Sequence, residues 1–389
     1  MLEILQHFQF LYDGVAFFFS AEGWKNLVMI LIGGLLIYLA LVKDFEPALL
    51  MPMGFGAILV NIPWSGAIGT AADGSTGIVQ WLFRVGIEAS EAMPLLLFIG
   101  IGAMIDFGPL LSNPKMLLFG AAAQFGIFLT VFLASFIFPF KEAAAIGIIG
   151  AADGPTSILV SKIFESENMG AIAVAAYSYM ALVPIIQPAA IRLVTTKKER
   201  MIRMPYNPKS VSRLTRILFP IIVTIIAGLV APASVSLVGM LMFGNLLQEC
   251  LKLDSLSQTA QTTLANLITI LLGLTISFTM RAEQFLTVAT IVIMALGLVA
   301  FVFDTIGGVL FAKLMNLFLP EGKKINPMVG GAGISAFPMS ARVIQKMALK
   351  EDNQNHLLMH AVGANVAGQI GSVVAGGIIL TVVPRLIGA

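Results

Sequence analysis

The sequence predicts an all-α polytopic membrane protein, a transporter-like bundle with an inverted repeat and two broken helices. The first observation is composition: 58% of the 389 residues are apolar and only 11% are charged, whereas a soluble domain carries about 25% charged residues. The second is a set of apolar runs that approach or reach the roughly 20 residues needed to cross a bilayer. These runs are 26–42, 116–138, 169–186, 217–231 and 285–303. The third is a glycine-rich, polar interruption in each half of the chain.

Residues 1–25 predict an interfacial segment ahead of the first span. They have no basic region at the start, carry an acidic Glu3 and place Asp13 inside the apolar stretch, so they do not resemble a cleaved signal peptide. An amphipathic helix whose phenylalanines, among them Phe8 and Phe17, bury in the headgroup boundary fits better. A frayed terminus is the alternative.

Cysteine and histidine usage excludes two kinds of chemistry. The lone Cys250 cannot make an internal disulfide framework, and the three histidines are too scattered for a transition-metal cluster. The net charge of +2 hides a basic loop at 192–216, where eight basic residues face one acid, Glu199. The positive-inside rule makes this loop cytoplasmic. It separates a first membrane repeat, 26–191, from a second, 217–389.

Each predicted repeat contains an interruption. The first joins the apolar run 143–149 to Gly-Ala-Ala-Asp-Gly-Pro-Thr-Ser at 150–157, and the second joins Asn326-Pro327 to the glycines that precede Ser335. Proline removes a backbone donor and clustered glycines favour non-helical geometry. Broken backbone survives in a bilayer only where it is buried in protein or lines a wet cavity, so each break indicates a ligand site. Close helix packing by small residues is the alternative.

A third polar stretch, 69–76, resembles the Asp153 segment but has Ser75 in place of the proline. The sequence between Asn61 and Gly77 is too polar for bilayer depth. We interpret it as a loop near the interface, with Asp73 as a second membrane carboxylate the less favoured reading.

Asp153 is the strongest single candidate for chemistry, because an ionisable residue between apolar runs is costly and therefore functional by default. Its carboxylate and the neighbouring hydroxyls are hard oxygen ligands that suit a small alkali cation. The alternative is a helix cap before Pro155. Asn326, Ser335 and Asn365 are the matching groups of the second half and add oxygen ligands without charge. Asn326 could instead be a turn or cap, and Asn365 could hydrogen-bond between helices.

Two further side chains complete the candidate set. Tyr179 lies in the middle of an apolar helix, where a phenol near a carboxylate could pass on a proton. One of the two tyrosines there, Tyr177 and Tyr179, is expected to be an ordinary packing residue. Arg342 could bind an anionic carboxyl group through two parallel hydrogen bonds. Snorkelling to the headgroups is its alternative role.

These segments together resemble the beta subunits of the sodium-transporting biotin-dependent decarboxylases, which act on oxaloacetate, methylmalonyl-CoA, glutaconyl-CoA or malonate. The likeness covers nearly the whole chain, although the first half is shorter than in the longest oxaloacetate-type members. The matching segments are Phe45–Pro47, Gly100–Met104, Asp106–Leu111, Gly147–Ser157, Ala171–Pro188, Gly244–Leu246, Asn326–Pro327, Gly333–Ala336 and His360–Ser372.

The resemblance implies a membrane subunit that decarboxylates carboxybiotin, consumes a proton and exports sodium. It implies sodium or proton coupling at Asp153 and Tyr179, and at the second-half residues Asn326, Gly330, Ser335, Arg342 and Asn365. Sodium would be bound by Asp153, Asn326, Gly330, Ser335 and Asn365, with Gly330 letting the backbone approach the ion, and Arg342 would hold carboxybiotin.

The same resemblance implies a set of partners in the cytoplasmic membrane. Carboxybiotin would be supplied by a biotin carrier subunit and not be attached to this chain. A soluble carboxyltransferase subunit and a small single-span membrane subunit complete the expected complex, with lipid around it and copies of the chain assembled together; no nucleic acid is expected. A sodium/proton or sodium-coupled secondary transporter without catalysis is the main alternative. A non-catalytic membrane anchor for a soluble decarboxylase is the second alternative.

Overall fold

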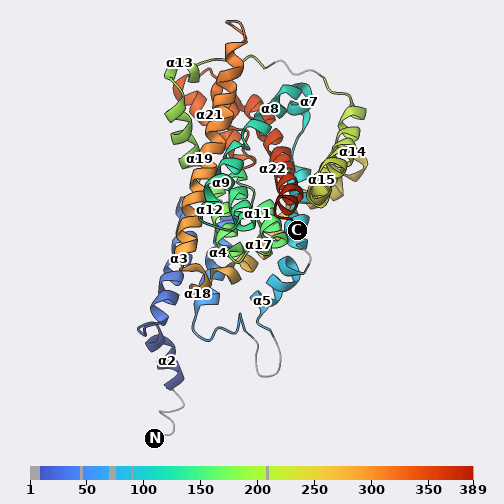
Figure 1. Cartoon of the computed structure of the whole chain (residues 1–389). Helices are drawn as coiled ribbons and strands as arrows, with labels where there is room; N and C mark the ends of the chain where they lie inside the picture. Colours follow the sequence, from blue (N-terminus) through green and yellow to red (C-terminus); the bar gives the residue numbers. More distant parts are fainter. Residues whose placement is uncertain (1–8, 44–46, 70–75, 90, 207–209, 389) are drawn as a thin grey trace. The chain divides into compact units, whose positions relative to one another are not determined.

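The computed structural model describes residues 9–43, 47–69, 76–89, 91–206 and 210–388 of the chain. Within these ranges the regular structure is entirely helical (Figure 1), as predicted. Glu3, Phe8, Phe45, Asp73 and Ser75, named above, lie outside the described residues.

Five described helices are long and apolar enough to cross a membrane, by length and composition. They are Gly23–Val42, Pro114–Ala134, Asp254–Met280, Val288–Leu317 and Leu358–Leu386. Three of them contain or overlap predicted runs. The predicted run 169–186 lies in a helix bent by 72° between Met180 and Leu182. The run 217–231 overlaps a helix of 18 residues that ends at Val230. The multi-pass membrane protein predicted from the sequence is therefore confirmed, whereas the inverted repeat stays a prediction.

The helices before the basic loop are α2 (Gln9–Phe17), α3 (Gly23–Val42), α4 (Pro47–Asn61), α5 (Ile78–Phe83), the π-helix η1 (Arg84–Glu88), α6 (Ala92–Met104), α7 (Gly108–Ser112), η2 (Pro114–Met116), α8 (Leu117–Ala122), α9 (Phe125–Ala134), α10 (Phe140–Gly147), η3 (Ile148–Ala151), α11 (Gly154–Ile163) and α12 (Met169–Val194).

The remaining helices are α13 (Lys197–Arg200), α14 (Arg213–Val230), η4 (Pro232–Ser234), α15 (Val235–Glu249), η5 (Leu251–Leu253), α16 (Asp254–Gln258), the π-helix η6 (Thr259–Leu264), α17 (Ala265–Ile276), η7 (Ser277–Met280), α18 (Ala282–Phe285), α19 (Val288–Leu317), α20 (Pro327–Gly331), α21 (Met339–Glu351) and α22 (Leu358–Leu386).

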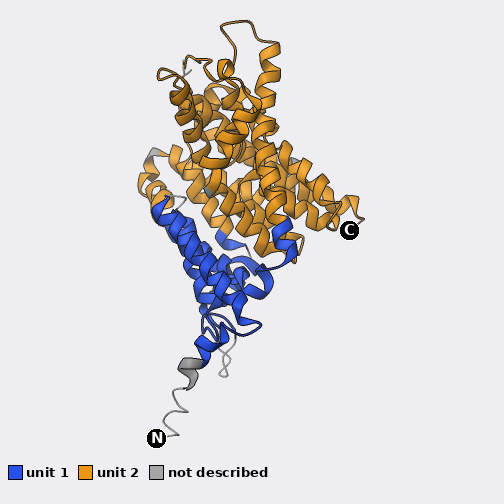
Figure 2. Ribbon diagram, turned by 90° about the vertical axis from the view of Figure 1, so that its left-hand side faces the viewer, with its two compact units in different colours: residues 1–93, 266–292 blue, residues 94–265, 293–389 orange. Residues whose placement is uncertain are grey.

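The chain divides into two compact units (Figure 2): residues 1–93 with 266–292, and residues 94–265 with 293–389. A division into compact units does not test whether the chain contains two repeats. The predicted repeats, 26–191 and 217–389, separated by the basic loop at 192–216, therefore remain a prediction. Inside the first unit α3 and α4 pack backbone to backbone, because a Cβ added at Gly33 would lie 2.6 Å from the Gly54 carbonyl oxygen. Asn61, fully buried, donates to the Met280 carbonyl at 2.9 Å and accepts from the Ala282 amide at 2.8 Å.

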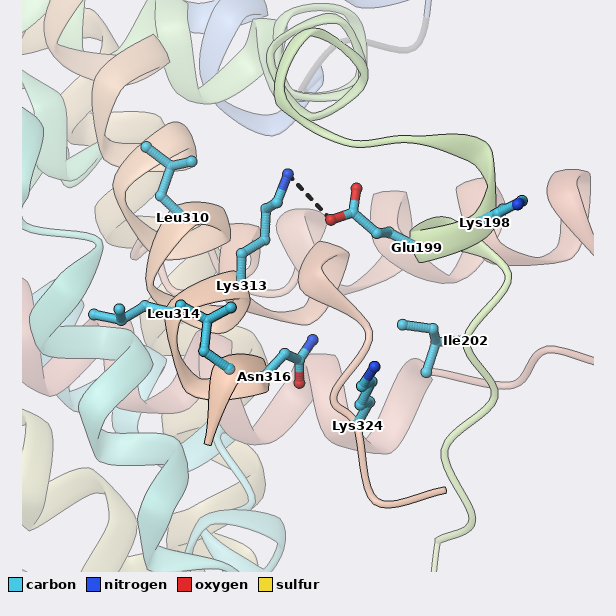
Figure 3. Close-up of a pocket in the computed structure, with 9 residues that line it drawn as sticks. Lys198, Glu199, Ile202, Leu310, Lys313, Leu314, Asn316 and Lys324 are labelled. Atoms are coloured by element: carbon cyan, nitrogen blue, oxygen red, sulfur yellow. Dashed lines mark ion pairs between the residues drawn. The ribbon is translucent and has the colours of Figure 1, made fainter. Parts of the chain in front are cut away.

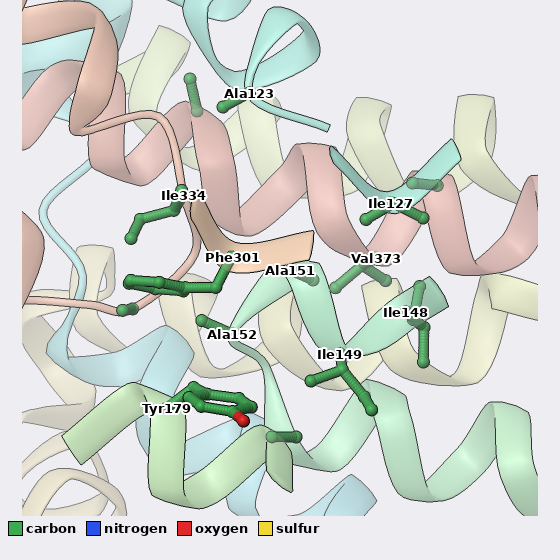
Figure 4. Packing of buried hydrophobic residues seen from close by; sticks show 14 of the residues in the cluster. Ala123, Ile127, Ile148, Ile149, Ala151, Ala152, Tyr179, Phe301, Ile334 and Val373 are labelled. Atoms are coloured by element: carbon green, nitrogen blue, oxygen red, sulfur yellow. The ribbon is translucent and has the colours of Figure 1, made fainter. Parts of the chain in front are cut away.

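The second unit holds the large apolar core, and the first predicted break runs through its middle. Ile148, Ile149 and Ala151 pack there with Phe301 of α19 and Val373 of α22 (Figure 4). Every one of these side chains is at most 1% exposed. A break in a membrane helix is therefore held from all sides by other helices, which is the condition under which irregular backbone is tolerated at bilayer depth.

Candidate functional site

The first break is a change of direction between η3 and α11. Ala152 takes a left-handed conformation with φ of 51°, which costs a residue with a Cβ about 1–2 kcal/mol. The next residue, Asp153, is the N-cap of α11, and Pro155 occupies the first turn, where a missing donor costs nothing. Strained backbone that persists is over-determined by its surroundings, and such residues concentrate at functional sites.

Asp153 is 5% exposed and its carboxylate is bound by three donors. Oδ2 accepts from the Thr156 hydroxyl at 2.7 Å and from the Ser372 hydroxyl of α22 at 3.1 Å, while Oδ1 accepts from the Thr156 amide at 3.4 Å. The capping role weighed in the sequence analysis is therefore present. Capping leaves part of the hydrogen-bonding capacity of the carboxylate unused, because Oδ1 accepts only the one long hydrogen bond from the Thr156 amide.

The second break follows α20 and meets the first directly. Ser335 donates both its amide, at 3.2 Å, and its hydroxyl, at 2.8 Å, to the carbonyl oxygen of Ala151. Ala151 lies two residues before Asp153. The two interruptions, 184 residues apart in sequence, are thus in hydrogen-bond contact in the fold.

Helix α22 supplies amides to the same place. Asn365 donates through Nδ2 to the Ile334 carbonyl at 2.6 Å, and Gln369, one turn later, donates through Nε2 to the Ser335 carbonyl. Asn365 is fully buried and Gln369 is 4% exposed. In the described structure the oxygens Asn365 Oδ1 and Gln369 Oε1 have no hydrogen-bond partner. Buried acceptors without a donor are rare and each requires an explanation. These two, with the Asp153 carboxylate and the hydroxyls that bind it, form what we call the α22 oxygen cluster.

Two predicted ligands have contacts elsewhere. Asn326, fully buried, caps α20 by accepting from the Met328 amide at 3.1 Å, and its Nδ2 donates at 2.8 Å to the carbonyls of Arg200 and Ile202. Gly330 packs against α19, where an added Cβ would lie 2.0 Å from the Gly308 carbonyl. These contacts favour the cap and the small-residue packing that were the alternatives. The sodium-binding role of both residues stays a prediction.

The two tyrosines of α12 have different surroundings. Tyr179 donates its hydroxyl to the Met294 carbonyl of α19. Tyr177 lies on the first break, since a Cβ at Gly154 would be 2.1 Å from its ring. The Tyr177 hydroxyl is buried without a partner in the described structure. Tyr177 is thus in contact with the residue next to Asp153, and Tyr179 is tied to α19.

Arg342 is exposed on α21, outside the α22 oxygen cluster. The other end of α21 is fixed to the basic loop by two ion pairs, Arg200 with Glu351 at 2.8 Å and Arg203 with Asp352 at 2.6 Å. The hydrogen bond from Arg203 lowers the pKa of Asp352 below its usual value. The second break is therefore connected through α21 to the predicted cytoplasmic surface.

Sequence reasoning missed one carboxylate. Asp304 lies in the middle of α19 and is fully buried. Its Oδ1 accepts from the Ile127 amide at 3.0 Å, in the first turn of α9, and its Oδ2 has no hydrogen-bond partner among the described residues. A Cβ at Gly150 would be 2.6 Å from that Oδ2. The signal was available, because Asp304 interrupts an apolar stretch of spanning length, but the apolar run was ended at residue 303. Gln369 and Ser372 were also given no role.

The α22 oxygen cluster favours a particular class of ligand. Within the described residues no group of three or more His, Cys, Asp or Glu side chains could hold a metal ion. A carboxylate, amide oxygens and hydroxyl oxygens are hard ligands of the kind that suits a monovalent cation. A multi-pass helical protein that encloses such a cluster between interrupted helices is a membrane protein of the cation-transporting class.

The comparisons with known proteins identify the family. The family described as the Na+-transporting oxaloacetate decarboxylase beta subunit matches residues 25–383. The chain belongs to this family of sodium-pumping decarboxylase beta subunits, as the resemblance in the sequence predicted.

Curated relatives extend over almost the full length. The chain is 51% identical to glutaconyl-CoA decarboxylase subunit beta of Acidaminococcus fermentans over 366 residues, 94% of this chain and 95% of the relative. It is 48% identical to methylmalonyl-CoA decarboxylase subunit beta of Propionigenium modestum, covering 92% and 94%. It is 45% identical to the probable oxaloacetate decarboxylase beta chain of Vibrio cholerae over 415 aligned residues, 92% and 95%. That last alignment is longer than the 389 residues of this chain, so it contains insertions relative to it.

Proposed function

We propose that this subunit decarboxylates carboxybiotin presented by a partner's biotin carrier and uses the reaction to export sodium while consuming a proton. The relatives named above are beta subunits of decarboxylases, and their family is described as sodium-transporting. The observation that supports the proposal best is the pair of unpartnered oxygens, Asn365 Oδ1 and Gln369 Oε1, on the helix whose Ser372 binds Asp153.

Sodium is the ligand these oxygens suit. A desolvated amide oxygen without a donor costs about 1–3 kcal/mol, and a bound cation removes that cost for both residues at once. Asp153 supplies the compensating negative charge, and the hydroxyls of Thr156, Ser335 and Ser372 can each offer a lone pair while donating elsewhere. The assembled site would have a net charge of zero with sodium bound, which is the least costly state in a low-dielectric interior.

Coupling follows from electrostatics. When carboxybiotin loses CO2, the bond from the ureido nitrogen to the carboxyl carbon breaks and that nitrogen takes up a proton. A proton that passes through Asp153 on its way to the ureido nitrogen removes the negative charge that holds sodium, so the affinity of the site for sodium falls. If the sodium site has by then become accessible from the outer side of the membrane, sodium leaves to that side. Tyr179, with its hydroxyl on Met294, and Tyr177, against Gly154, are the phenols available to pass on that proton.

Arg342 is the residue we assign to the carboxyl group of carboxybiotin. It is exposed, and a planar guanidinium can hold a carboxylate through two hydrogen bonds. It lies on α21, which runs from the second break to the basic loop, so an anion bound there would approach from the predicted cytoplasmic side. The proposed partners are the biotin carrier, a soluble carboxyltransferase that selects the acyl substrate, and a small single-span membrane subunit.

The test is to reconstitute the complex in proteoliposomes and to follow loss of labelled carboxybiotin and uptake of labelled sodium together. We expect both to be sodium-dependent and to stop together when the carrier is omitted. Sodium movement driven by a proton gradient alone, with no loss of CO2 from carboxybiotin, would favour the secondary-transporter alternative and overturn this proposal.

A further inference from the structure

A basic cavity lies beside α19, at the end of the helix that meets the basic loop. Its volume is about 670 Å³, and it is lined by α19 on one side and by residues of the basic loop and Lys324 on the other. Lys313 of α19 pairs with Glu199 at 3.1 Å (Figure 3). Lys313 also donates to the Val194 carbonyl at 3.0 Å. We call this space the lysine pocket.

The lysine pocket carries excess positive charge. Lys313 and Glu199 neutralise each other, and hydrogen bonds from the Thr196 backbone and from Lys313 outweigh the effect of burial and lower the pKa of Glu199. Lys198 and Lys324 also line the pocket. The nearest acid to Lys324 is Glu321 at 3.8 Å, which is 96% exposed, and such surface pairs are worth little. The charges left uncompensated favour an anion.

The pocket continues into an apolar groove. A second cavity, of about 610 Å³, lies between α19 and the α8–α9 pair and shares Leu310 and Leu314 with the lysine pocket. Phe125, Phe128 and Phe311 line it further along. Leu310 and Leu314 are 49% and 50% exposed, one helical turn apart. One end of the combined space is thus cationic, and the other is apolar and open to the side of the helix bundle.

We propose that the lysine pocket and the apolar groove together bind one anionic phospholipid, with its phosphate at Lys198 and Lys324 and an acyl chain along Leu310, Leu314 and the phenylalanines. The chemistry of both ends matches a lipid: a phosphate is attracted by ammonium groups, and hydrocarbon fills a groove lined by leucine and phenylalanine. Basic pockets beside membrane helices on the cytoplasmic side are the expected place for anionic headgroups. The site is separate from the α22 oxygen cluster and independent of the proposed sodium mechanism.

The bound lipid would connect α19 to the loop around residues 198–202. Asp304 and Met294, which α19 contributes to the region of the first break, lie on the same continuous helix. A lipid that holds the end of α19 therefore stabilises the helix that caps α9 and accepts from Tyr179. We expect an anionic phospholipid to raise the thermal unfolding midpoint of the purified protein more than a zwitterionic one with identical acyl chains.

The experiment is native mass spectrometry of the detergent-purified full-length protein, stripped of lipid and then titrated with phosphatidylglycerol or phosphatidylcholine of the same chains. We expect one phosphatidylglycerol to bind at lower concentration than phosphatidylcholine. The double variant Lys198→Gln, Lys324→Gln should lose that preference, by about 25-fold in affinity, since each lysine near an anionic headgroup is worth about fivefold. The matched control is Lys197→Gln, Lys346→Gln, which removes the same charge from exposed lysines outside the pocket and should keep the preference.

A third variant tests the apolar groove. Leu314→Trp should weaken both lipids, because the larger side chain occupies the acyl groove while the lysines stay in place. Unchanged phosphatidylglycerol binding in the double lysine variant would overturn the proposal, and so would equal loss in the control. Competition by glycerol 3-phosphate as strong as that by the whole lipid would show a site for free phosphate. If Leu314→Trp changed the mass of the oligomer and not lipid binding, a second copy of the chain, and no lipid, would cover the groove.

Discussion

Replacing Asp153 by Asn is the most informative perturbation of the proposed sodium site. The substitution keeps the size of the side chain and removes its charge. The amide can still accept from the Thr156 amide through its oxygen, while its nitrogen donates to the hydroxyls of Thr156 and Ser372, which can reverse roles because a hydroxyl both donates and accepts. Capping of α11 and contact with α22 should therefore survive, and the protein should fold.

The loss in sodium affinity can be bounded from the geometry. Two unit charges 2.4 Å apart at an effective dielectric of about 20 attract by about 7 kcal/mol. Part of this is offset, because a buried carboxylate is no longer desolvated in the variant. Removing one partner of a buried ion pair costs about 3–5 kcal/mol. At about 1.4 kcal/mol per tenfold, sodium affinity should fall by about two to three and a half orders of magnitude.

The assay measures sodium binding and turnover in the same preparation. Isothermal titration of the purified complex gives the sodium dissociation constant, and proteoliposomes give sodium-dependent loss of carboxybiotin. Asp106→Asn is the matched control, since Asp106 is 54% exposed and lies 3.7 Å from Arg216, away from the α22 oxygen cluster. Parental sodium affinity in Asp153→Asn, with the control unchanged, would show that Asp153 serves only as a cap and would refute the reasoning.

Three further predictions concern the surroundings of the site. Asn365→Ala should raise the sodium concentration for half-maximal decarboxylation by about tenfold, because one ligand oxygen is lost. Asn326→Ala should instead lower the thermal stability and leave that sodium concentration within about twofold of the parental value. An equal shift in both variants would mean that Asn326 is also a sodium ligand. Asp304→Asn should fold, because an amide oxygen can still accept from the first turn of α9. It should flatten the pH dependence of turnover, because it removes a carboxyl that we expect to exchange a proton. An unaltered pH profile would show that Asp304 is a purely structural cap. Arg203→Gln should lower the unfolding midpoint at pH 7, and this effect should disappear as the pH falls below about 4. The reason is that the pKa of Asp352 is lowered in the folded state, so its carboxylate stabilises the fold above the unfolded pKa and ceases to do so as the pH falls through the folded pKa. A difference in midpoint that persisted in acid would mean that Arg203 acts through something other than Asp352.

The sequence predicted the elements whose cause is local. Apolar runs of spanning length predicted the membrane helices. The clustered Gly and Pro around Asp153 predicted the first break, because these residues change the conformation of their own backbone. The capping role of Asp153 also followed from its position before Pro155. Each of these features depends on neighbours within a few residues, which a sequence displays directly.

The features that the sequence did not predict depend on which helices meet. Nothing near Gln369 indicates that its side chain contacts the second break at Ser335, since that depends on how α22 crosses the segment after α20. The same holds for the two tyrosines, which only tertiary contacts distinguish: Tyr177 packs against Gly154, and Tyr179 donates to the Met294 carbonyl. Asp304 was missed for another reason: a carboxylate inside an apolar run was treated as the end of the run and not as a buried residue.

The contact between the two breaks has a consequence for leakage. A backbone carbonyl has two lone pairs, and the Ala151 oxygen accepts from both the amide and the hydroxyl of Ser335. Both lone pairs of this one carbonyl are therefore engaged, so the Ala151 oxygen is not available as a ligand for a dehydrated ion. This carbonyl, at the contact between the two interrupted helices, is in this way insulated from passing ions. A cell that stores energy as a sodium gradient depends on such insulation, since every ion that slips back through the pump discharges what decarboxylation has charged.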